Sequence, residues 1–490
     1  MLKRRTLLKL LGVAVVAWCP RRRSWLGVSE AEAGVDPTPT LDGTLETDPG
    51  TLDAFSTDFG NLVTHRPAAV LRPGSVEDIV KMVRFARSRG IRVAVNGQAG
   101  TDDSRESHSQ FGQALTEAGL AIDIKPLATI FGIDETRQTA DVGAGVRWNE
   151  LLDAAGAFGL APAVLADYAR LSVGGTLSVG GIGGHTWRFG TQADNVLELE
   201  VVTGAGDHVT CSRTQQADLF DAVLAGCAQV AIIVRARVRL VPAQQQAMVF
   251  ELFYDDLATC LADHTALLHN SPFDYHEGTL SRRADDTGWR YVIEVAKYFT
   301  PPDMPDPNAL LAGLHDDRSS AQISTTTYTA WQLRLDPLVD FLKSVGAWGT
   351  PHPWLSVFIP GSAATSVVGD IAARLTTADL GLGAALLYPV DTSRIQVPLF
   401  RLPNEPVAFA LTLLRFPTDP TTAPGMLEQN RQIYDEVVAA GGERYVIGAI
   451  PRFTQQDWRR HFSPEWGRLT SAKHRYDPDN ILAPGWGIFK

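Results

Sequence analysis

The pattern of hydrophobic and polar positions predicts that the ordered part of the chain begins with a β-α-β unit. Residues 68–73 (AAVLRP) and 91–95 (IRVAV) are short apolar runs typical of strands. Between them, residues 75–90 carry apolar side chains at helical spacing. Ser75 is a suitable N-cap for this helix, and Gly90 is a suitable stop.

The pattern continues with elements of both kinds. Residues 146–159 repeat the helical spacing, residues 196–212 predict a hairpin around two glycines, and residues 231–242 alternate as a strand. Longer strands mixed with amphipathic helices then predict a second domain over 243–445, and short helices and turns fill 446–490. We therefore expect an α+β fold with two domains.

The division of the chain follows from these elements. The first domain is expected over residues 61–242, and residues 446–490 are expected to return to it. Residues 34–60 are rich in Pro, Gly, Thr and Asp, which favours a linker. The 490 residues, 45% of them hydrophobic, are enough for two cores.

The N-terminus predicts an export signal over residues 1–33. Arg4 and Arg5 precede a short apolar run, and an Ala-x-Ala cleavage pattern ends before Gly34. The run is too short to span a bilayer. This is typical of the twin-arginine route, which carries folded proteins and suits a chain that binds a cofactor first. We expect a periplasmic or secreted protein that has no membrane attachment after cleavage.

The net charge and the positions of the potential metal ligands exclude several classes of binding partner. The formal net charge is −11, and no lysine or arginine block lies in the body of the chain. Nucleic acids and anionic membranes are therefore not expected to bind. We expect no metal site, because the three cysteines left after cleavage are widely spaced and no second ligand lies near His108.

A glycine-rich stretch covers residues 166–190 (ADYARLSVGGTLSVGGIGGHTWRFG) and is a candidate for binding a phosphate group. Consecutive glycines let backbone N–H groups approach a phosphate closely, because no Cβ intervenes. The spacing differs from the dinucleotide-binding fingerprint of a Rossmann unit. Spacing alone leaves a phosphate cradle and a tight structural turn both open.

Several motifs together resemble one family. HSQFGQA (residues 108–114) and DYARLSVGGTLSVGGIGG (167–184) are similar to the FAD-binding domain of the vanillyl-alcohol-oxidase, or PCMH-type, flavoproteins, and most similar to the cytokinin dehydrogenases. FDYHEG (273–278), PHPWLSVFIPGS (351–362) and YDPDNILAPG (476–485) add to the likeness. The resemblance implies a PCMH-type FAD-binding domain and an α+β substrate-binding cap domain.

The resemblance assigns FAD as cofactor and implies roles for particular residues. His108 matches the histidine that carries FAD covalently through its 8α-methyl group. Seven further residues match positions that contact FAD: Ser109, Gln113, Ser172, Ser178, Ile182, Ile233 and Trp486. The glycines would then let the backbone pack against the dinucleotide.

Two carboxyl groups match the family's substrate site. Asp167 matches an aspartate that hydrogen-bonds the secondary amine of the substrate. When hydride leaves carbon for the flavin, the nitrogen loses a proton, and a partly desolvated carboxylate can accept it. Glu277 matches a glutamate near the mouth of the pocket, where a substrate contact and a solvent-facing position are both open.

The sequence departs from the family at two places. Residues 96–107 (NGQAGTDDSRES) replace a compact Arg-Gly-x-Gly before His108, as if polar residues were inserted into the phosphate loop. An alternative register would put Gly100 at the histidine position and leave FAD non-covalent. Trp486 stands where the family has a glutamine, and its indole can donate a hydrogen bond but cannot accept one.

These features together predict an exported FAD-dependent oxidoreductase with a small-molecule substrate. The expected reaction is oxidation of a secondary amine, an N6-isoprenoid adenine (a cytokinin), which yields adenine and an aldehyde after imine hydrolysis. Two alternatives are an oxidase of an alcohol or sugar and a non-catalytic binding protein on the same fold. The electron acceptor, quinone or oxygen, is left open.

Overall fold

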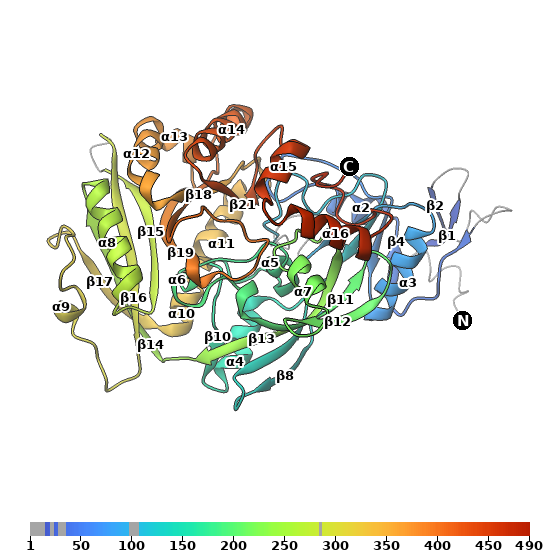
Figure 1. The fold of residues 1–490 in the computed structure, drawn as a ribbon, viewed down its shortest axis with the longest axis horizontal. Coiled ribbons are helices and arrows are strands. Elements are labelled where there is room, and N and C mark those ends of the chain that lie inside the picture. The colour runs from blue at the N-terminus through green and yellow to red at the C-terminus, as the bar shows by residue number, and fades with distance from the viewer. Residues whose placement is uncertain (1–14, 20–23, 28–35, 98–106, 284–286) are drawn as a thin grey trace.

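The computed structural model describes residues 15–19, 24–27, 36–97, 107–283 and 287–490. Figure 1 shows two lobes side by side, each built of sheets and helices. The lobe that holds most of residues 36–242 is called the first domain here, and the lobe that follows it is called the second domain. The α+β architecture with two domains confirms the sequence prediction.

The first sheet of the first domain is organised by helix α3 (Val76–Arg87). The helix begins at Ser75, whose hydroxyl accepts a hydrogen bond from the Asp78 backbone N–H (3.3 Å). It connects two strands that both run parallel to a third, so the predicted β-α-β unit is confirmed. The sheet order is β4 (Thr44–Glu46), β5 (Ala69–Arg72), β7 (Leu120–Asp123) and β6 (Val93–Asn96).

The second sheet of the first domain is antiparallel and is centred on a long strand. The predicted hairpin forms as β11 and β12, and the alternating segment 231–242 forms β13 between β11 and β9. The strands are β8 (Ile130–Asp134), β9 (Thr139–Gly143), β10 (Leu160–Pro162), β11 (Val196–Thr203), β12 (His208–Ser212) and β13 (Ala231–Pro242). The helices around it are α4 (Trp148–Gly156), α5 (Val173–Leu177), α6 (Thr186–Phe189) and α7 (Ala217–Val223).

One antiparallel sheet of eight strands forms the second domain. Its strand order is β17 (Gln322–Thr327), β14 (Gln246–Tyr254), β16 (Trp289–Phe299), β15 (Tyr275–Arg282), β19 (Ala384–Asp391), β20 (Val407–Leu414), β18 (Leu355–Pro360) and β21 (Glu443–Gly448). Strand β21 crosses residue 445, so the sheet extends beyond the predicted end of this domain.

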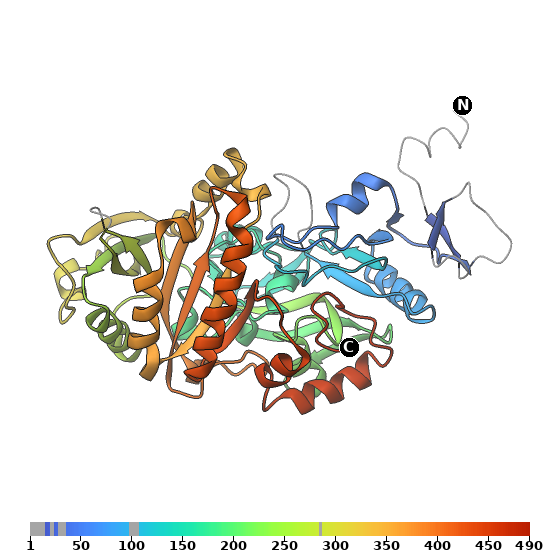
Figure 2. The same cartoon turned by 90° about the horizontal axis from the view of Figure 1, so that it is seen from above.

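Three helices cover one face of that sheet with apolar side chains. Figure 2 shows α14 (Ala423–Ala439) lying along the sheet, and α8 (Leu257–Asn270) and α12 (Ala364–Arg374) pack into the same core. The opposite face is left to meet the first domain, where α10 (Tyr328–Gln332) and α11 (Asp336–Ser344) also lie. The site described below forms between this face and the first domain.

Residues 36–60, part of the segment expected to be a linker, belong to the first domain. Strand β4 pairs with β5, and helix α2 (Pro49–Ala54) follows it. Phe55 and Phe59 are buried, 4% and 1% exposed. This part of the linker prediction is wrong, because the Pro, Gly and Asp residues form turns and helix caps within a packed segment rather than a spacer.

The C-terminal segment packs against the first domain. Its helices are α15 (Gln455–His461) and α16 (Trp466–Tyr476). Beyond them the chain adds a short parallel bridge to β6, in which Val93 exchanges backbone hydrogen bonds with residues 481 and 483 (2.8 and 2.9 Å). Lys473 is buried and forms an ion pair with Asp477 (2.6 Å).

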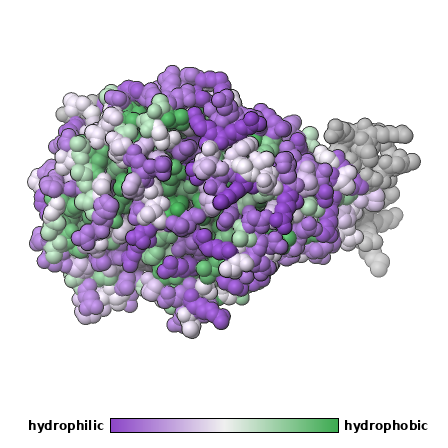
Figure 3. Space-filling model, in the orientation of Figure 1, coloured by the Kyte–Doolittle hydropathy of each residue, from purple (hydrophilic) through white to green (hydrophobic). Residues whose placement is uncertain are grey.

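The expected export signal lies mostly outside the described residues. Within it, β1 (Val15–Cys19) pairs with β2 (Ser24–Gly27), and the ring of Trp25 stacks on Phe85 of α3 with 5.5 Å between centroids. Among the residues that the structure describes, no helix has the length and apolar character needed to cross a membrane. The face drawn in Figure 3 is mostly hydrophilic, with apolar side chains in small groups.

Candidate active site

His108 lies against a cluster of aromatic rings. The ring of Tyr168 stacks on the imidazole (5.2 Å between centroids, 12° between planes), and the rings of Phe59 and Trp354 lie 4.7 and 4.9 Å away. Its Nε2 atom is buried and has no hydrogen-bond partner within the described part of the chain. Burial, together with the nearby His352, lowers the pKa of His108 to about 3. The imidazole is therefore neutral at physiological pH.

Asp167 is brought to the same region, because the residue that follows it, Tyr168, stacks on His108. The Asp167 carboxylate accepts a hydrogen bond from the Tyr275 hydroxyl (3.1 Å) and lies 3.5 Å from the Arg334 guanidinium. Tyr275 and Glu277 are two positions apart on β15 and so share one face of the strand. Arg334 donates to the Tyr275 hydroxyl and to the Glu277 carboxyl group (3.3 Å).

Glu277 is the most buried acid of this cluster. Its side chain is 5% exposed, against 18% for Asp167. Burial raises the pKa of Glu277 well above its ordinary value, the charge of Asp167 raises it further, and Arg334 opposes both effects. Burial and the neighbouring Asp167 carboxylate therefore both favour the protonated form of Glu277. This burial rules out the solvent-facing position for Glu277, and its contact with substrate stays a prediction.

The glycine-rich stretch 166–190 is packed closely against other parts of the protein. A Cβ atom on Gly180 would lie 2.2 Å from the ring of Phe400, and one on Gly184 would lie 2.2 Å from the ring of Tyr275. Gly180 also has a positive φ of 104°, which side chains disfavour. Close contact with aromatic rings of the second domain thus favours glycine at both positions, whether or not the stretch binds a phosphate.

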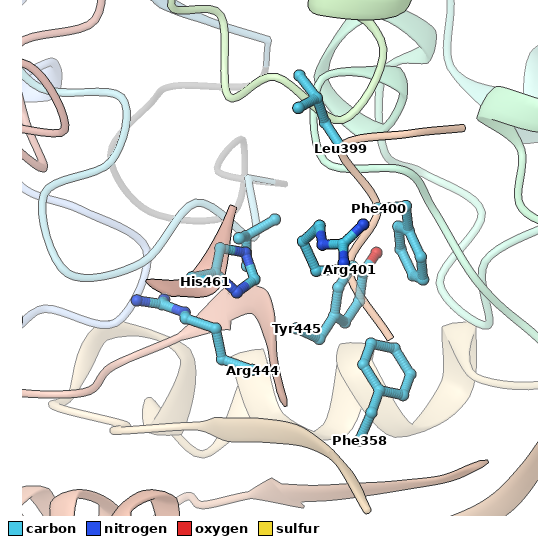
Figure 4. A pocket seen from close by; sticks show the side chains of 8 residues that line it. Phe358, Leu399, Phe400, Arg401, Arg444, Tyr445 and His461 are labelled. Atoms are coloured by element: carbon cyan, nitrogen blue, oxygen red, sulfur yellow. The ribbon is translucent and has the colours of Figure 1, made fainter. Parts of the chain in front are cut away.

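A tyrosine of the second domain anchors the same stretch. The backbone N–H of Gly181 donates to the hydroxyl of Tyr445 on β21 (3.2 Å). Figure 4 shows that hydroxyl beside Phe400 and Arg401, with the ring of Phe358 close by. The rings of Phe358, Phe400 and Tyr445 lie 5.4–5.7 Å apart between centroids. This contact fixes the position of the glycine stretch relative to the second domain.

Four other residues that are predicted to contact FAD are hydrogen-bonded or buried within the first domain. Ser172 caps helix α5 by accepting a hydrogen bond from within its first turn (3.3 Å), and the Ser178 hydroxyl donates to a carbonyl of the same helix (2.8 Å). Ile182 and Ile233 are buried in the main core, 7% and 5% exposed. These side chains are therefore already engaged in the fold around the glycine stretch.

Trp486 lies against the loop that carries His108. Its indole N–H donates to the carbonyls of Gln110 and Phe111 (3.2 and 3.0 Å), so its single donor is used within the protein. Ser109 and Gln113, the predicted FAD contacts of this loop, are half-buried on either side. Through this indole N–H, the tryptophan supports the loop that carries His108.

A cavity of about 250 Å³ opens beside Trp486 and Phe111. Arg444 lies in its wall, with its guanidinium 4.5–4.9 Å from the rings of Phe453, Trp458 and Trp486. Burial lowers the pKa of Arg444 to about 10, and its Nε has no hydrogen-bond partner among the described residues. The cavity therefore combines aromatic walls with a positive charge.

Residues 67–212 match an FAD-binding domain, and residues 279–489 match the FAD- and cytokinin-binding domain of cytokinin dehydrogenases. The chain is 36% identical to a fasciation-locus oxidoreductase of Rhodococcoides fascians, over 91% of this chain and 99% of that protein. It is 33% identical to cytokinin dehydrogenase 7 of rice (91% of both chains) and 32% identical to cytokinin dehydrogenase 2 of Arabidopsis thaliana (93% and 95%).

The chain belongs to the cytokinin dehydrogenase family. As a member of that family it is an FAD-dependent oxidoreductase, and the predicted cofactor and fold are confirmed.

The residues present fit an FAD molecule. His108 offers a neutral ring nitrogen without a protein partner, and the positive cavity at Arg444 lies beside the same loop. At Gly97, a Cβ atom would lie 2.0 Å from the Ser172 hydroxyl, so a larger residue at this end of the predicted phosphate loop would displace that hydroxyl. The rest of that loop, including Gly100 and the apparent insertion, lies outside the described residues.

Sequence reasoning missed several residues of this family member's site. Arg334 follows α10 in a segment, WQLRLD, that has no recognisable motif. Phe59 lies in the segment taken for a linker, Trp348 lies in a short 3-10 helix (Ala347–Gly349), and Trp354 is the residue before β18. The one available signal was that Tyr275 and Glu277 alternate on a strand and that another acid, Glu294, lies on the neighbouring strand.

Proposed function

We propose that the chain oxidises a secondary amine, an N6-isoprenoid adenine, with Asp167 as the base that accepts the amine proton. The observation that carries this proposal is the placement of Asp167. Its carboxylate faces the Tyr275 hydroxyl and the Arg334 guanidinium, while the next residue stacks on His108. The names of the relatives and the cytokinin-binding domain match support the choice of substrate.

The chemistry divides between the cofactor and the chain. FAD, when bound, supplies the acceptor for the hydride that leaves the substrate carbon. Asp167 takes the proton from the adjacent nitrogen, so a C–N single bond becomes C=N and no atom is unaccounted for. Tyr275 and Arg334 hold the Asp167 carboxylate in place. The imine product then hydrolyses to adenine and an aldehyde.

We further propose that FAD is attached through His108. Burial makes its imidazole neutral, which is the form that can bond to a cofactor methyl group, and Nε2 has no competing partner among the described residues. Gln113, Ser109, Ser172, Ser178, Ile182, Ile233 and Trp486 would surround the cofactor. The test is acid precipitation of the purified enzyme. Yellow colour retained in the pellet, and lost to the supernatant in a His108→Ala variant, supports the linkage; colour in the wild-type supernatant contradicts it.

The amine reaction is tested by anaerobic titration of the mature enzyme with isopentenyladenine, followed by flavin absorbance. Bleaching is expected, and Asp167→Asn should slow it by about 10²–10⁴-fold, the usual contribution of a general base. Asp340→Asn is a matched control, since that carboxylate on α11 is 61% exposed and lies 3.8 Å from the Arg170 guanidinium. An intact flavin that isopentenyladenine does not bleach would contradict the proposal and favour an alcohol or sugar substrate.

A further inference from the structure

Within the described part of the chain, Arg334 is a cation on which three carboxyl groups converge. Its guanidinium lies 3.5 Å from Asp167, 3.3 Å from Glu277 and 3.5 Å from Glu294. It also bonds to the Tyr275 hydroxyl and lies over the rings of Tyr275 and Trp331 (4.8 and 4.4 Å to the centroids). These contacts hold the guanidinium in one place, because flat aromatic faces enclose it on two sides.

The charges of this cluster cannot all be present at once. Three carboxylates against one guanidinium would leave two negative charges uncompensated in a site where the side chains are 5–23% exposed. Burial disfavours such charge, so at least one carboxyl group keeps its proton. The acids titrate as a coupled group, and the question is which one holds the proton.

Hydrogen bonding decides between Asp167 and Glu277. Asp167 accepts a bond from the Tyr275 hydroxyl and pairs with Arg334, and both contacts favour its carboxylate form. Glu277 is the least exposed, and its Oε1 atom is buried and accepts no hydrogen bond in the described part of the chain. A proton on Glu277 fits this environment. Burial also raises the pKa of Glu294, which is the most exposed of the three acids.

The other groups that face Arg334 leave this balance unchanged. Burial lowers the pKa of His185 to about 3 and raises the pKa values of Tyr275 and Tyr298 well above their ordinary value, so all three are neutral near pH 7. The titratable groups around the guanidinium are Asp167, His185, Tyr275, Glu277, Glu294 and Tyr298.

We infer that Arg334 is a positioning residue that keeps Asp167 ionised while Glu277 holds the shared proton. This inference rests on the proposed role of Asp167 as base. With one proton on Glu277, the cluster carries one excess negative charge, and the proton that Asp167 takes from the amine removes it. The proton transfer therefore neutralises charge within the carboxyl cluster, while the electron pair of the hydride would go to FAD, and this favours proton transfer to Asp167.

The location of the proton is tested by difference infrared spectroscopy of the holoenzyme without substrate. A protonated carboxyl C=O band is expected at pH 7, absent in Glu277→Gln and retained in Asp167→Asn. A wild-type band lost in Asp167→Asn and kept in Glu277→Gln would overturn the inference. Because no substrate is present, this result stands whether or not isopentenyladenine is oxidised.

The role of Arg334 is tested with two variants and a control. In Arg334→Met a second protonated carboxyl band is expected at pH 7, which disappears when Asp167→Asn is added. The acid limb of kcat/KM should rise by about 1–2 pH units, the usual effect of losing a nearby opposite charge. Arg334→Lys keeps the charge and should restore part of the shift, which covers the case where the methionine variant does not fold.

Arg290→Met is the matched control. Arg290 lies on the same sheet and holds two carboxylates, Asp255 at 3.1 Å and Asp317 at 2.9 Å, away from Asp167. Its acid limb should stay at the wild-type pH. An unshifted limb and an unchanged band pattern in both Arg334 variants would show that Arg334 has a structural role alone.

Discussion

Gly184 offers a direct test of the link between the glycine stretch and the base. In Gly184→Ala the new Cβ would lie 2.2 Å from Cζ and 2.3 Å from Cε2 of the Tyr275 ring. Carbon atoms pack at about 3.5–4.0 Å, so the ring must move by more than about 1 Å. Tyr275 is 2% exposed, so its ring has little room to move freely.

The displacement has a functional cost that can be worked out. The Tyr275 hydroxyl bonds to Asp167 at 3.1 Å, and a shift of about 1 Å takes it beyond hydrogen-bonding distance. Misplacing a catalytic group by this amount lowers the rate by about 10²-fold. Overpacking should also cost about 1–3 kcal/mol of folding free energy. We expect an enzyme that folds, binds FAD and reduces it slowly.

The assay is stopped-flow flavin reduction by isopentenyladenine, with thermal unfolding measured on the same sample. Tyr275→Phe removes the hydroxyl without overpacking and should slow reduction by about 10-fold, the value of one hydrogen bond to a charged group. Gly156→Ala is the matched control, because a Cβ there meets no atom within 4 Å. A Gly184→Ala enzyme within twofold of the wild-type rate would refute the reasoning.

Three further predictions follow from other parts of the chain. Lys473→Met leaves Asp477 buried without its cation (2.6 Å in the wild type) and should lower the free energy of unfolding by about 3–5 kcal/mol in urea titrations; a loss below 1 kcal/mol would contradict this. Burial lowers the pKa of His276 to about 3, so its contribution to stability is present above pH 6.5 and is lost as the pH falls below it. Between pH 7 and 5 this amounts to about 2 kcal/mol, and His276→Phe should remove that difference; equal pH dependence in both proteins would oppose it. We propose that Arg4 and Arg5 direct export, so replacing both with lysine should leave flavin-loaded precursor in the cytoplasm on cell fractionation, whereas normal export would refute it.

Local sequence signals predicted the local structure well. The helix after Ser75, the hairpin at residues 196–212 and the strand at 231–242 form where expected, because each is fixed by periodicity and caps within its own segment. The linker prediction for residues 36–60 was wrong for the same reason, because it rested on a local signal alone. Their composition resembles a linker, and only tertiary packing makes Phe59 a wall of the site.

The sequence predicted only those residues of the site that lie in recognisable motifs. Asp167, His108 and Glu277 were named because each lies in a motif of the family. Arg334 lies 167 residues from Asp167 in sequence and in no motif, yet it joins all the acids of the cluster. No periodicity encodes such a contact, since it depends on how the second domain's sheet lies against the glycine stretch.

The return of the C-terminal segment to β6 has a consequence for the order of events during synthesis. Domains generally fold as units, with the N-terminal one first. Here the parallel bridge from Val93 is made to Leu482, which is translated after the whole second domain. The sheet that contains β6 therefore stays incomplete until the whole second domain has been translated. The cavity beside Trp486 is thus completed only after the second domain has been translated.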